Sequence, residues 1–264
     1  NLMDTEAGLR AYHEGHIPGA RYAHLDDDLA ARRGPATGRH PLPDAADFAA
    51  RLADWGITPA TRVIAYDAAG GALAARLWWL LRWAGHQRVA LLDGGLPAWT
   101  AAGLPLETGA VTPGTTVTTP YPVRPGSMPT VTTAELQRRL AAGVTLLDAR
   151  DSQRFAGVTE PIDARAGHVP GARNWPFSNN LDADGRFLPV DELQGRLASW
   201  LGAPGHNGIV SMCGSGVTAC HTLFALEYAG LTAAMPAYPA LYVGSWSEWI
   251  ADPDRPVAVG TAAN

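Results

Sequence analysis

The strongest constraint on the fold of this chain is an internal repeat. The hexapeptide Gly-His-Ile-Pro-Gly-Ala at residues 15–20 recurs as Gly-His-Val-Pro-Gly-Ala at 167–172, with five of six positions identical. Two more pairs follow in the same order and at similar spacing, 63–67 with 209–213 and 83–85 with 228–230. One hexapeptide alone could match by chance, but three pairs of similar segments in the same order are much stronger evidence of a repeat. It predicts two domains of similar fold that arose by duplication.

A stretch without helix-forming character separates the two halves. Residues 108–129 contain five prolines and six threonines and are expected to form an extended linker. The predicted organisation is therefore an N-terminal domain at 1–107, the linker at 108–129 and a C-terminal domain at 130–264. Each half falls near the common size of a domain, about 100 to 200 residues.

Short β-branched segments alternate with helical patterns in both halves. Residues 144–148 and 208–212 are typical of buried strands, and Thr132 with Glu135 three residues later is typical of a helix start. Leu77, Leu80 and Leu81 share one face of a predicted helix. The pattern predicts an α/β fold with two domains, each a mainly parallel sheet with helices on both faces.

Composition excludes some kinds of partner. The net charge of −5 provides no basic surface for nucleic acid. The most apolar stretch, 72–85, contains two arginines and is shorter than the roughly 20 residues that a membrane span needs, so we expect a core helix and no membrane partner. Two cysteines cannot form a disulfide framework, which favours a reducing, cytoplasmic location.

Both cysteines lie in one segment that points to chemistry. Cys213 follows the predicted strand at 208–212, Gly214 and Gly216 permit a tight turn, and a helix is expected at 217–228. Sites in parallel sheets lie at the carboxyl ends of strands. Converging backbone N–H groups and a helix N-terminus stabilise an anion in such a loop, so Cys213 is predicted to be a nucleophilic thiolate.

Four other interpretations of the cysteines compete with a nucleophilic thiolate. A metal site lacks further ligands at suitable spacing, and no metal is expected. A Cys213–Cys220 disulfide would distort the start of the helix. A cysteine phosphatase needs an arginine where this chain has Ala219, so that reaction is excluded. An inert buried cysteine stays open for Cys213 and is the favoured interpretation for Cys220.

Taken together, these motifs resemble the tandem-domain rhodanese-type sulfurtransferases. The resemblance rests on the two Gly-His-Ile/Val-Pro-Gly-Ala segments, on Asp93-Gly94-Gly95, on the Cys-Gly-Ser-Gly-Val-Thr loop at 213–218 and on Gly-Ser-Trp-Ser-Glu-Trp at 244–249. It covers essentially the whole chain. The resemblance implies that Cys213 accepts sulfur from a donor as a persulfide and passes it to a thiol or cyanide, with no cofactor.

The resemblance also implies roles for named residues. The backbone amides of Gly214, Gly216, Val217 and Thr218 would hold the sulfur, Ser215 would handle protons with His16, and Arg154 would bind the donor. His16 has an alternative as a structural turn histidine, like His168, and Arg154 as a surface arginine. The second donor arginine of the family belongs where this chain has Ile162, so Arg165 is the candidate substitute.

The loop sequence bears on the sulfur donor. Mercaptopyruvate-using relatives carry Cys-Gly-Ser-Gly-Val-Thr, as here, whereas thiosulfate-using relatives place cationic side chains after the cysteine. The expected donor is 3-mercaptopyruvate, with thiosulfate or a non-enzymatic persulfide carrier as alternatives. In the first domain Asp67 stands at the position of Cys213, which predicts a catalytically silent domain. The resemblance implies that the first domain of the family begins with a strand before the segment at Asn1, which we expect to be missing from the given sequence.

Overall fold

The chain forms two compact units. The computed structural model describes residues 5–110, 119–202 and 208–261, so the predicted linker lies partly outside the described residues, at 111–118. One unit comprises Asn1–Arg32 and Leu42–Ser127, and the other comprises Arg33–Pro41 and Met128–Asn264. The segment Arg33–Pro41 thus belongs to the second unit although the first unit flanks it in sequence. The domain boundaries drawn from the sequence stay a prediction.

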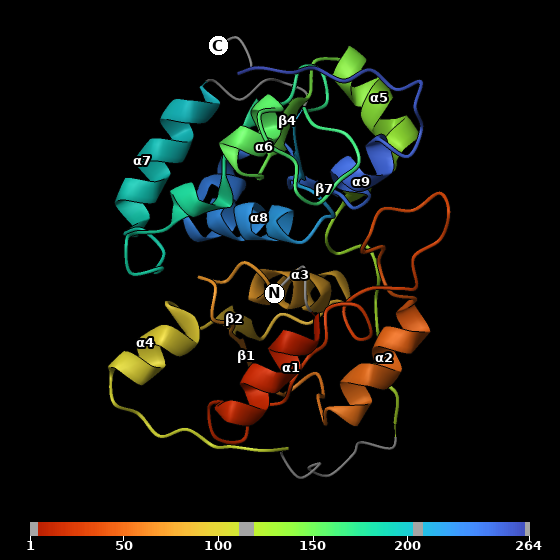
Figure 1. Cartoon of the computed structure of the whole chain (residues 1–264). Coiled ribbons are helices and arrows are strands. Elements are labelled where there is room, and N and C mark those ends of the chain that lie inside the picture. The colour runs from red at the N-terminus through yellow and green to blue at the C-terminus, as the bar shows by residue number, and fades with distance from the viewer. Residues whose placement is uncertain (1–4, 111–118, 203–207, 262–264) are drawn as a thin grey trace. The chain divides into compact units, whose positions relative to one another are not determined.

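The first unit is mostly helical around a small parallel sheet. Its helix α3 packs beside the paired strands β1 and β2 (Figure 1). This helix is the apolar stretch predicted to be a core helix, and it is buried on nearly all sides, including Trp78 and Trp79. The elements are α1 (Thr5–Glu14), α2 (Ala45–Asp54), β1 (Val63–Ala65), α3 (Ala74–Trp83), β2 (Val89–Leu91) and α4 (Gly95–Ala101).

The second unit contains a five-stranded parallel sheet in the order β3-β7-β6-β4-β5. Helix α8 runs alongside its strands (Figure 1). The elements are β3 (Thr130–Val131), α5 (Thr133–Ala141), β4 (Thr145–Asp148), α6 (Ser152–Ala156), β5 (Arg173–Asn174), η1 (Phe177–Asn180), α7 (Val190–Leu201), β6 (Ile209–Met212), α8 (Thr218–Tyr228), η2 (Leu231–Ala234), β7 (Ala240–Tyr242) and α9 (Ser245–Trp249).

Helices cover both faces of this sheet. On one face, Val210 of β6 joins a core cluster with Leu136 of α5, Phe155 of α6 and Trp246 of α9. Side chains alternate along a strand, so Ser211 points to the other face, where its hydroxyl donates to the carbonyl of Ala219 in α8, 3.1 Å away. The α/β class with parallel strands and helices on both faces is confirmed.

The local sequence signals also hold. Thr132 is the N-cap of α5, and its hydroxyl accepts a hydrogen bond from the Glu135 amide at 3.2 Å. Such a cap supplies a partner for an amide that the helix itself cannot satisfy. The predicted strands at 144–148 and 208–212 are β4 and β6, each one residue shorter than expected.

The two sheets differ at one edge. In the second unit β6 lies between β7 and β4, and Val210 is fully buried, whereas in the first unit β1 pairs with β2 alone within the described residues. Ile64 of β1, which corresponds to Val210 in the repeat, is 57% exposed. No helix within the described ranges is both long and apolar enough to cross a bilayer.

Candidate active site

Cys213 lies where β6 ends and the loop to α8 begins. Its side chain is 2% exposed, and the amide N–H of Gly216 points at Sγ with the nitrogen 3.2 Å away. Gly216 has a φ of +80°, and a Cβ at this position would lie 2.6 Å from the carbonyl oxygen of Val243. Only glycine therefore allows the turn that brings this amide to the sulfur.

A second loop fixes the backbone of the cysteine loop. The amide of Cys213 donates to Ser245 Oγ at 3.1 Å, and the carbonyls of Cys213 and Gly214 accept from the amides of Trp246 and Ser247 at 3.0 and 2.9 Å. Ser245 is fully buried with a φ of +52°, a conformation that a non-glycine residue adopts only when its surroundings demand it. The Gly-Ser-Trp-Ser-Glu-Trp segment therefore holds the backbone of the cysteine loop in place through these hydrogen bonds.

Residues 214–217 are buried with Cys213, and Thr218 is half-buried. Val217 caps α8, Thr218 begins that helix, and Gly216 provides the one loop amide with a recorded hydrogen bond to Sγ among the described residues. The roles predicted for Gly214, Val217 and Thr218 stay predictions. Cys220 is fully buried and its thiol donates to the Gly216 carbonyl at 3.2 Å. Both cysteines are free, so the disulfide alternative is wrong.

Ser215 meets a histidine that the sequence did not single out. His40 Nδ1 lies 2.7 Å from Ser215 Oγ, and both side chains are buried. His40 comes from the segment Arg33–Pro41, which belongs to the same unit as the cysteine loop. A hydroxyl bonded to an imidazole forms a path along which a proton can move. The role in proton handling predicted for Ser215 stays a prediction.

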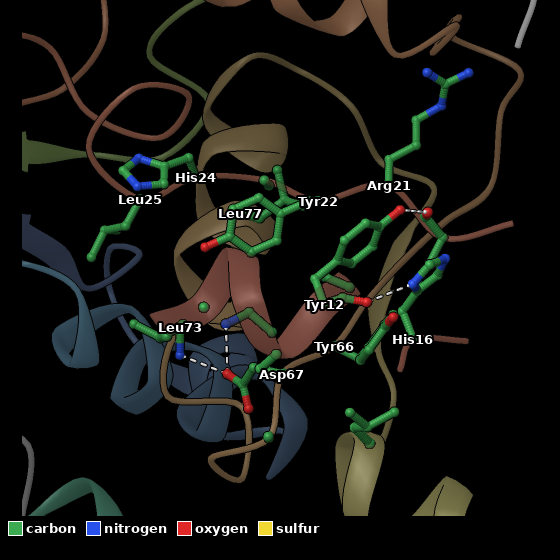
Figure 2. A pocket seen from close by; sticks show the side chains of 18 of the residues that line it. Tyr12, His16, Arg21, Tyr22, His24, Leu25, Tyr66, Asp67, Leu73 and Leu77 are labelled. Carbon is green, nitrogen blue, oxygen red and sulfur yellow. Dashed lines mark hydrogen bonds between the residues drawn. The ribbon is translucent and has the colours of Figure 1, made fainter. Parts of the chain in front are cut away.

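His16, the histidine predicted for that function, lies in the first unit. Its ring stacks on Tyr12 with centroids 3.9 Å apart, and Nδ1 bonds the Tyr12 carbonyl at 2.7 Å (Figure 2). Its twin His168 repeats this arrangement with Phe155, whose ring lies 3.8 Å away and whose carbonyl is 2.8 Å from Nδ1. The shared geometry supports the structural alternative for both histidines. A catalytic part for His16 stays a prediction.

Arg154 lies beside the cysteine loop and pairs with two buried carboxylates. Arg154 donates to Glu160 at 2.7 Å and to Asp163 at 3.1 Å, and it is 15% exposed. A Cβ built on Gly214 would lie 3.6 Å from Arg154 Nη2, so this guanidinium faces the residue that follows Cys213. The structure thus brings the predicted donor-binding arginine to the loop. Its binding role stays a prediction.

Arg150 is a buried positive charge that interacts electrostatically with Cys213. It donates to Asp148 at 2.7 Å and stacks over Trp246, with 4.6 Å from its guanidinium carbon to the ring centroid. Burial lowers the pKa of Arg150, but the charge of Asp148 and its hydrogen bond raise this pKa by more, so the net shift is upward. A negative charge on Cys213 also raises the pKa of Arg150. Electrostatic attraction therefore couples Arg150 to an anion at Cys213.

Arg165 points elsewhere. Its Nη1 donates to the carbonyl of Pro253 at 3.3 Å, and its own carbonyl accepts from the Trp246 indole at 2.9 Å. No recorded contact joins its guanidinium to the described cysteine loop or carboxylate cluster. The role suggested for Arg165 in donor binding stays a prediction without support from these contacts.

Sequence reasoning missed Arg39 and His40. They follow Gly38, where a Cβ would lie 2.4 Å from the carbonyl oxygen of Gly244, and this close approach seats the segment on the second loop. The available signal was weak. An Arg-His pair in a stretch rich in glycine and proline predicts a loop, and only tertiary contacts show which loop it meets.

The corresponding loop of the first unit holds an anion of its own. Asp67 Oδ1 accepts hydrogen bonds from the amides of Ala69 and Gly71, and Oδ2 accepts from those of Leu73 and Ala74, at 2.7 to 2.9 Å. Figure 2 shows Asp67 and Leu73 beside a hollow of about 520 Å³ within this unit. The repeat thus places a carboxylate among amides at the position where the second unit has a thiol.

Comparison with known proteins gives the same result. The chain matches the Rhodanese-like domain family at residues 2–102 and 132–252. It is 49% identical to a Pseudomonas aeruginosa protein named "Probable 3-mercaptopyruvate sulfurtransferase", over 98% of this chain and 89% of the relative. It is 35% identical to a "Thiosulfate sulfurtransferase" of the same organism, over 98% and 90% of the two chains.

A solved structure agrees in fold. The 3-mercaptopyruvate sulfurtransferase from Leishmania major superimposes with a TM-score of 0.81 at 31% identity, covering 94% of this chain and 67% of that one. The two matched domains, the near full-length relatives and the cysteine loop at the end of β6 lead to one assignment: the chain belongs to the rhodanese family and is a sulfurtransferase with two rhodanese-like domains.

Proposed function

We propose that the protein moves sulfur from 3-mercaptopyruvate through a persulfide on Cys213 to a thiol or cyanide acceptor. The observation that carries the proposal is the Gly216 amide directed at Cys213 Sγ, beside the Ser215–His40 pair. An amide in this place stabilises negative charge on sulfur both before and after transfer. The relatives named 3-mercaptopyruvate sulfurtransferase support the choice of donor.

The chemistry balances with the groups present. The Cys213 thiolate attacks the donor sulfur, an S–S bond forms, and the bond between that sulfur and C3 of the donor breaks. The electron pair of the broken bond passes to C3 as the enolate of pyruvate. The proton that the donor thiol loses ends on C3, and the Ser215–His40 pair is suitably built to carry it. An acceptor then attacks the outer sulfur and restores the thiolate.

Arg154 has the right chemistry for the carboxylate of this donor. A guanidinium binds a carboxylate through two parallel N–H groups, and Arg154 faces Gly214 beside the reacting cysteine. No cofactor enters any step. The acceptor remains a class, a thiol or cyanide, and a cytoplasmic location stays a prediction.

Thiosulfate is the second candidate donor. Arg39 and Arg154 both lie near Gly214, and two guanidinium groups suit a dianion. The 35% identical Pseudomonas aeruginosa relative carries the name of a thiosulfate sulfurtransferase. Steady-state turnover of the two donors on one preparation, with cyanide as acceptor, decides between them. A larger kcat/KM for thiosulfate would overturn the choice of 3-mercaptopyruvate.

The central experiment replaces Cys213 with serine. The wild-type protein treated with donor should gain the mass of one sulfur atom, and C213S should gain none and lose all measurable turnover. C220S serves as the matched control and should keep both signals, because Cys220 Sγ is bonded to the Gly216 carbonyl. Turnover retained in C213S would refute the assignment. A sulfur adduct without multiple turnover would instead favour the non-enzymatic carrier.

A further inference from the structure

Ser247 joins two segments of the second unit that meet at the candidate active site. Its backbone amide donates to the carbonyl of Gly214, the residue after the cysteine, at 2.9 Å. Its hydroxyl accepts from the amide of Arg39 at 3.0 Å, and Arg39 is followed directly by His40. We propose that Ser247 is a positioning residue that holds His40 against Ser215. This inference rests on the proposed function and concerns its proton transfer.

The segment that carries His40 is held by specific contacts instead of regular structure. In residues 33–41, which the structure describes throughout, the chain forms neither helix nor strand. The Arg39 guanidinium is bonded to a buried carboxylate, but a long side chain fixes the backbone only loosely. The Ser247 hydroxyl bonds the backbone itself, one residue before His40, whose Nδ1 lies 2.7 Å from Ser215 Oγ. The position of the imidazole therefore depends on this hydroxyl.

Loss of the Ser247 hydroxyl would affect one of its two partners more than the other. Oγ also donates to the carbonyl of Gly244 at 3.2 Å, and this carbonyl accepts from the amide of Glu248 at 3.1 Å as well. Without the hydroxyl, Gly244 would keep a partner, whereas the Arg39 amide would lose its acceptor. An amide in this situation turns toward water or another acceptor, because backbone donors are rarely left unpaired. The neighbouring His40 would move with it.

The internal repeat supports a functional reason for this serine. The amide before it, on Trp246, donates to the cysteine carbonyl at 3.0 Å, and in the first unit the amide of Leu96 donates to the Asp67 carbonyl at 2.9 Å. These matching bonds pair Ser247 with Pro97. Proline has neither an amide N–H nor a hydroxyl, so the first unit cannot form either bond at this position. The two bonds of Ser247 thus accompany the cysteine and not the aspartate.

A displaced His40 should affect one sulfur donor more than the other. With 3-mercaptopyruvate a proton must reach C3 of the donor, and the Ser215–His40 pair is suitably built to carry it. Thiosulfate leaves as sulfite and needs no proton on carbon. Misplacement of a catalytic group by about 1 Å can lower a rate about 100-fold. The loss of rate should therefore be selective for 3-mercaptopyruvate.

The test measures turnover of S247A with both donors. S247A should lower kcat for 3-mercaptopyruvate about 10- to 100-fold and leave kcat for thiosulfate nearly unchanged. S247T keeps a hydroxyl that can bond the carbonyl three residues earlier, so it should recover most of the lost kcat. S178A removes the hydroxyl of an exposed serine and should behave as wild type. S247C, close in size but with a weak acceptor, should show the same selective loss and decides the matter if S247A is unstable.

A double-mutant cycle shows whether Ser247 acts through His40. In the H40N background S247A should lower kcat for 3-mercaptopyruvate little further, because the group that it positions is already gone. An unchanged kcat in S247A and S247C would overturn the proposal. An equal fractional loss with both donors, or a full additional loss in H40N, would also overturn it, since Ser247 would then act through the cysteine loop. Absence of 3-mercaptopyruvate turnover in the wild type would instead refute the proposed function.

Discussion

The same strand–loop–helix unit occurs twice in this chain with opposite outcomes. At the end of β1, the Asp67 carboxylate accepts four backbone amides, whereas at the end of β6 the Cys213 sulfur accepts the amide of Gly216. Both loops are built to hold negative charge. The difference is whether the group that accepts the amides is a carboxylate, which cannot take up a sulfur atom, or a cysteine sulfur, which can.

This comparison explains why one residue decides the chemistry of a loop. A carboxylate cannot accept a sulfur atom, and Asp67 already occupies these four amide donors. A cysteine thiolate is nucleophilic, and its persulfide keeps the negative charge near the Gly216 amide that bonds Sγ. The first loop therefore resembles the second loop with its anion built in, which supports the prediction of a silent first domain.

The largest expected effect comes from making the second loop like the first. C213D should abolish turnover and the sulfur adduct, because a carboxylate cannot form a persulfide. Its thermal unfolding midpoint should equal or exceed that of C213S, because the loop amides can bind the new carboxylate as they bind Asp67. Intact mass, turnover and thermal unfolding check the three statements. A midpoint far below that of C213S would show that the amides do not converge.

The next effect concerns the Ser215–His40 pair beside the second loop. S215A and H40N should each lower kcat with 3-mercaptopyruvate about 100- to 1000-fold, and the double variant should lose little more, because the two side chains act as one unit. With thiosulfate the loss should be small, since cleavage of its S–S bond leaves sulfite and needs no proton on carbon.

H16N is the matched variant for this proton path. His16 lies in the first unit with its ring bonded to Tyr12, so H16N should keep kcat with both donors. A fall in kcat for H16N, with normal turnover in H40N, would restore the role that the sequence predicts for His16.

A moderate effect is expected on stability alone. D67N replaces a charged acceptor by a neutral amide and should cost about 2 kcal/mol in the free energy of unfolding of the first unit, measured by urea titration. The kcat for sulfur transfer should not change. D54N, at a carboxylate 61% exposed, is the control and should leave stability nearly unaltered. An unchanged free energy of unfolding in D67N would remove the basis of the comparison.

The smallest expected effect is a pH dependence of stability that arises from His86 in the first unit. Burial lowers the pKa of His86 in the first unit, and its backbone hydrogen bonds oppose this only in part. The folded state therefore binds the proton less readily than the unfolded state, so stability falls as the pH drops below the ordinary value of about 6.5. Wild type should lose more unfolding free energy than H86Q between about pH 7.5 and pH 5. Equal losses would contradict this reasoning.

The sequence by itself determined the repeated α/β fold, the placement of Cys213 at a strand end and the cap at Thr132. These features follow from signals that a short segment carries, namely strand periodicity, glycines that permit φ above zero, and hydroxyls that satisfy helix amides. Arg154 was also named from the sequence, through the resemblance of its local pattern to the family, and the structure pairs it with Glu160 and Asp163.

Only the tertiary structure decided which histidine meets Ser215 and which guanidinium joins Arg154. His40 and Arg39 lie about 175 residues from the cysteine loop, in a segment that packs with the second unit instead of its sequence neighbours. Such a contact depends on the close approach of Gly38 to Gly244 and on the buried balance of charges around Asp163. Local patterns do not encode contacts of this kind, because their free energy comes from groups that folding alone brings together.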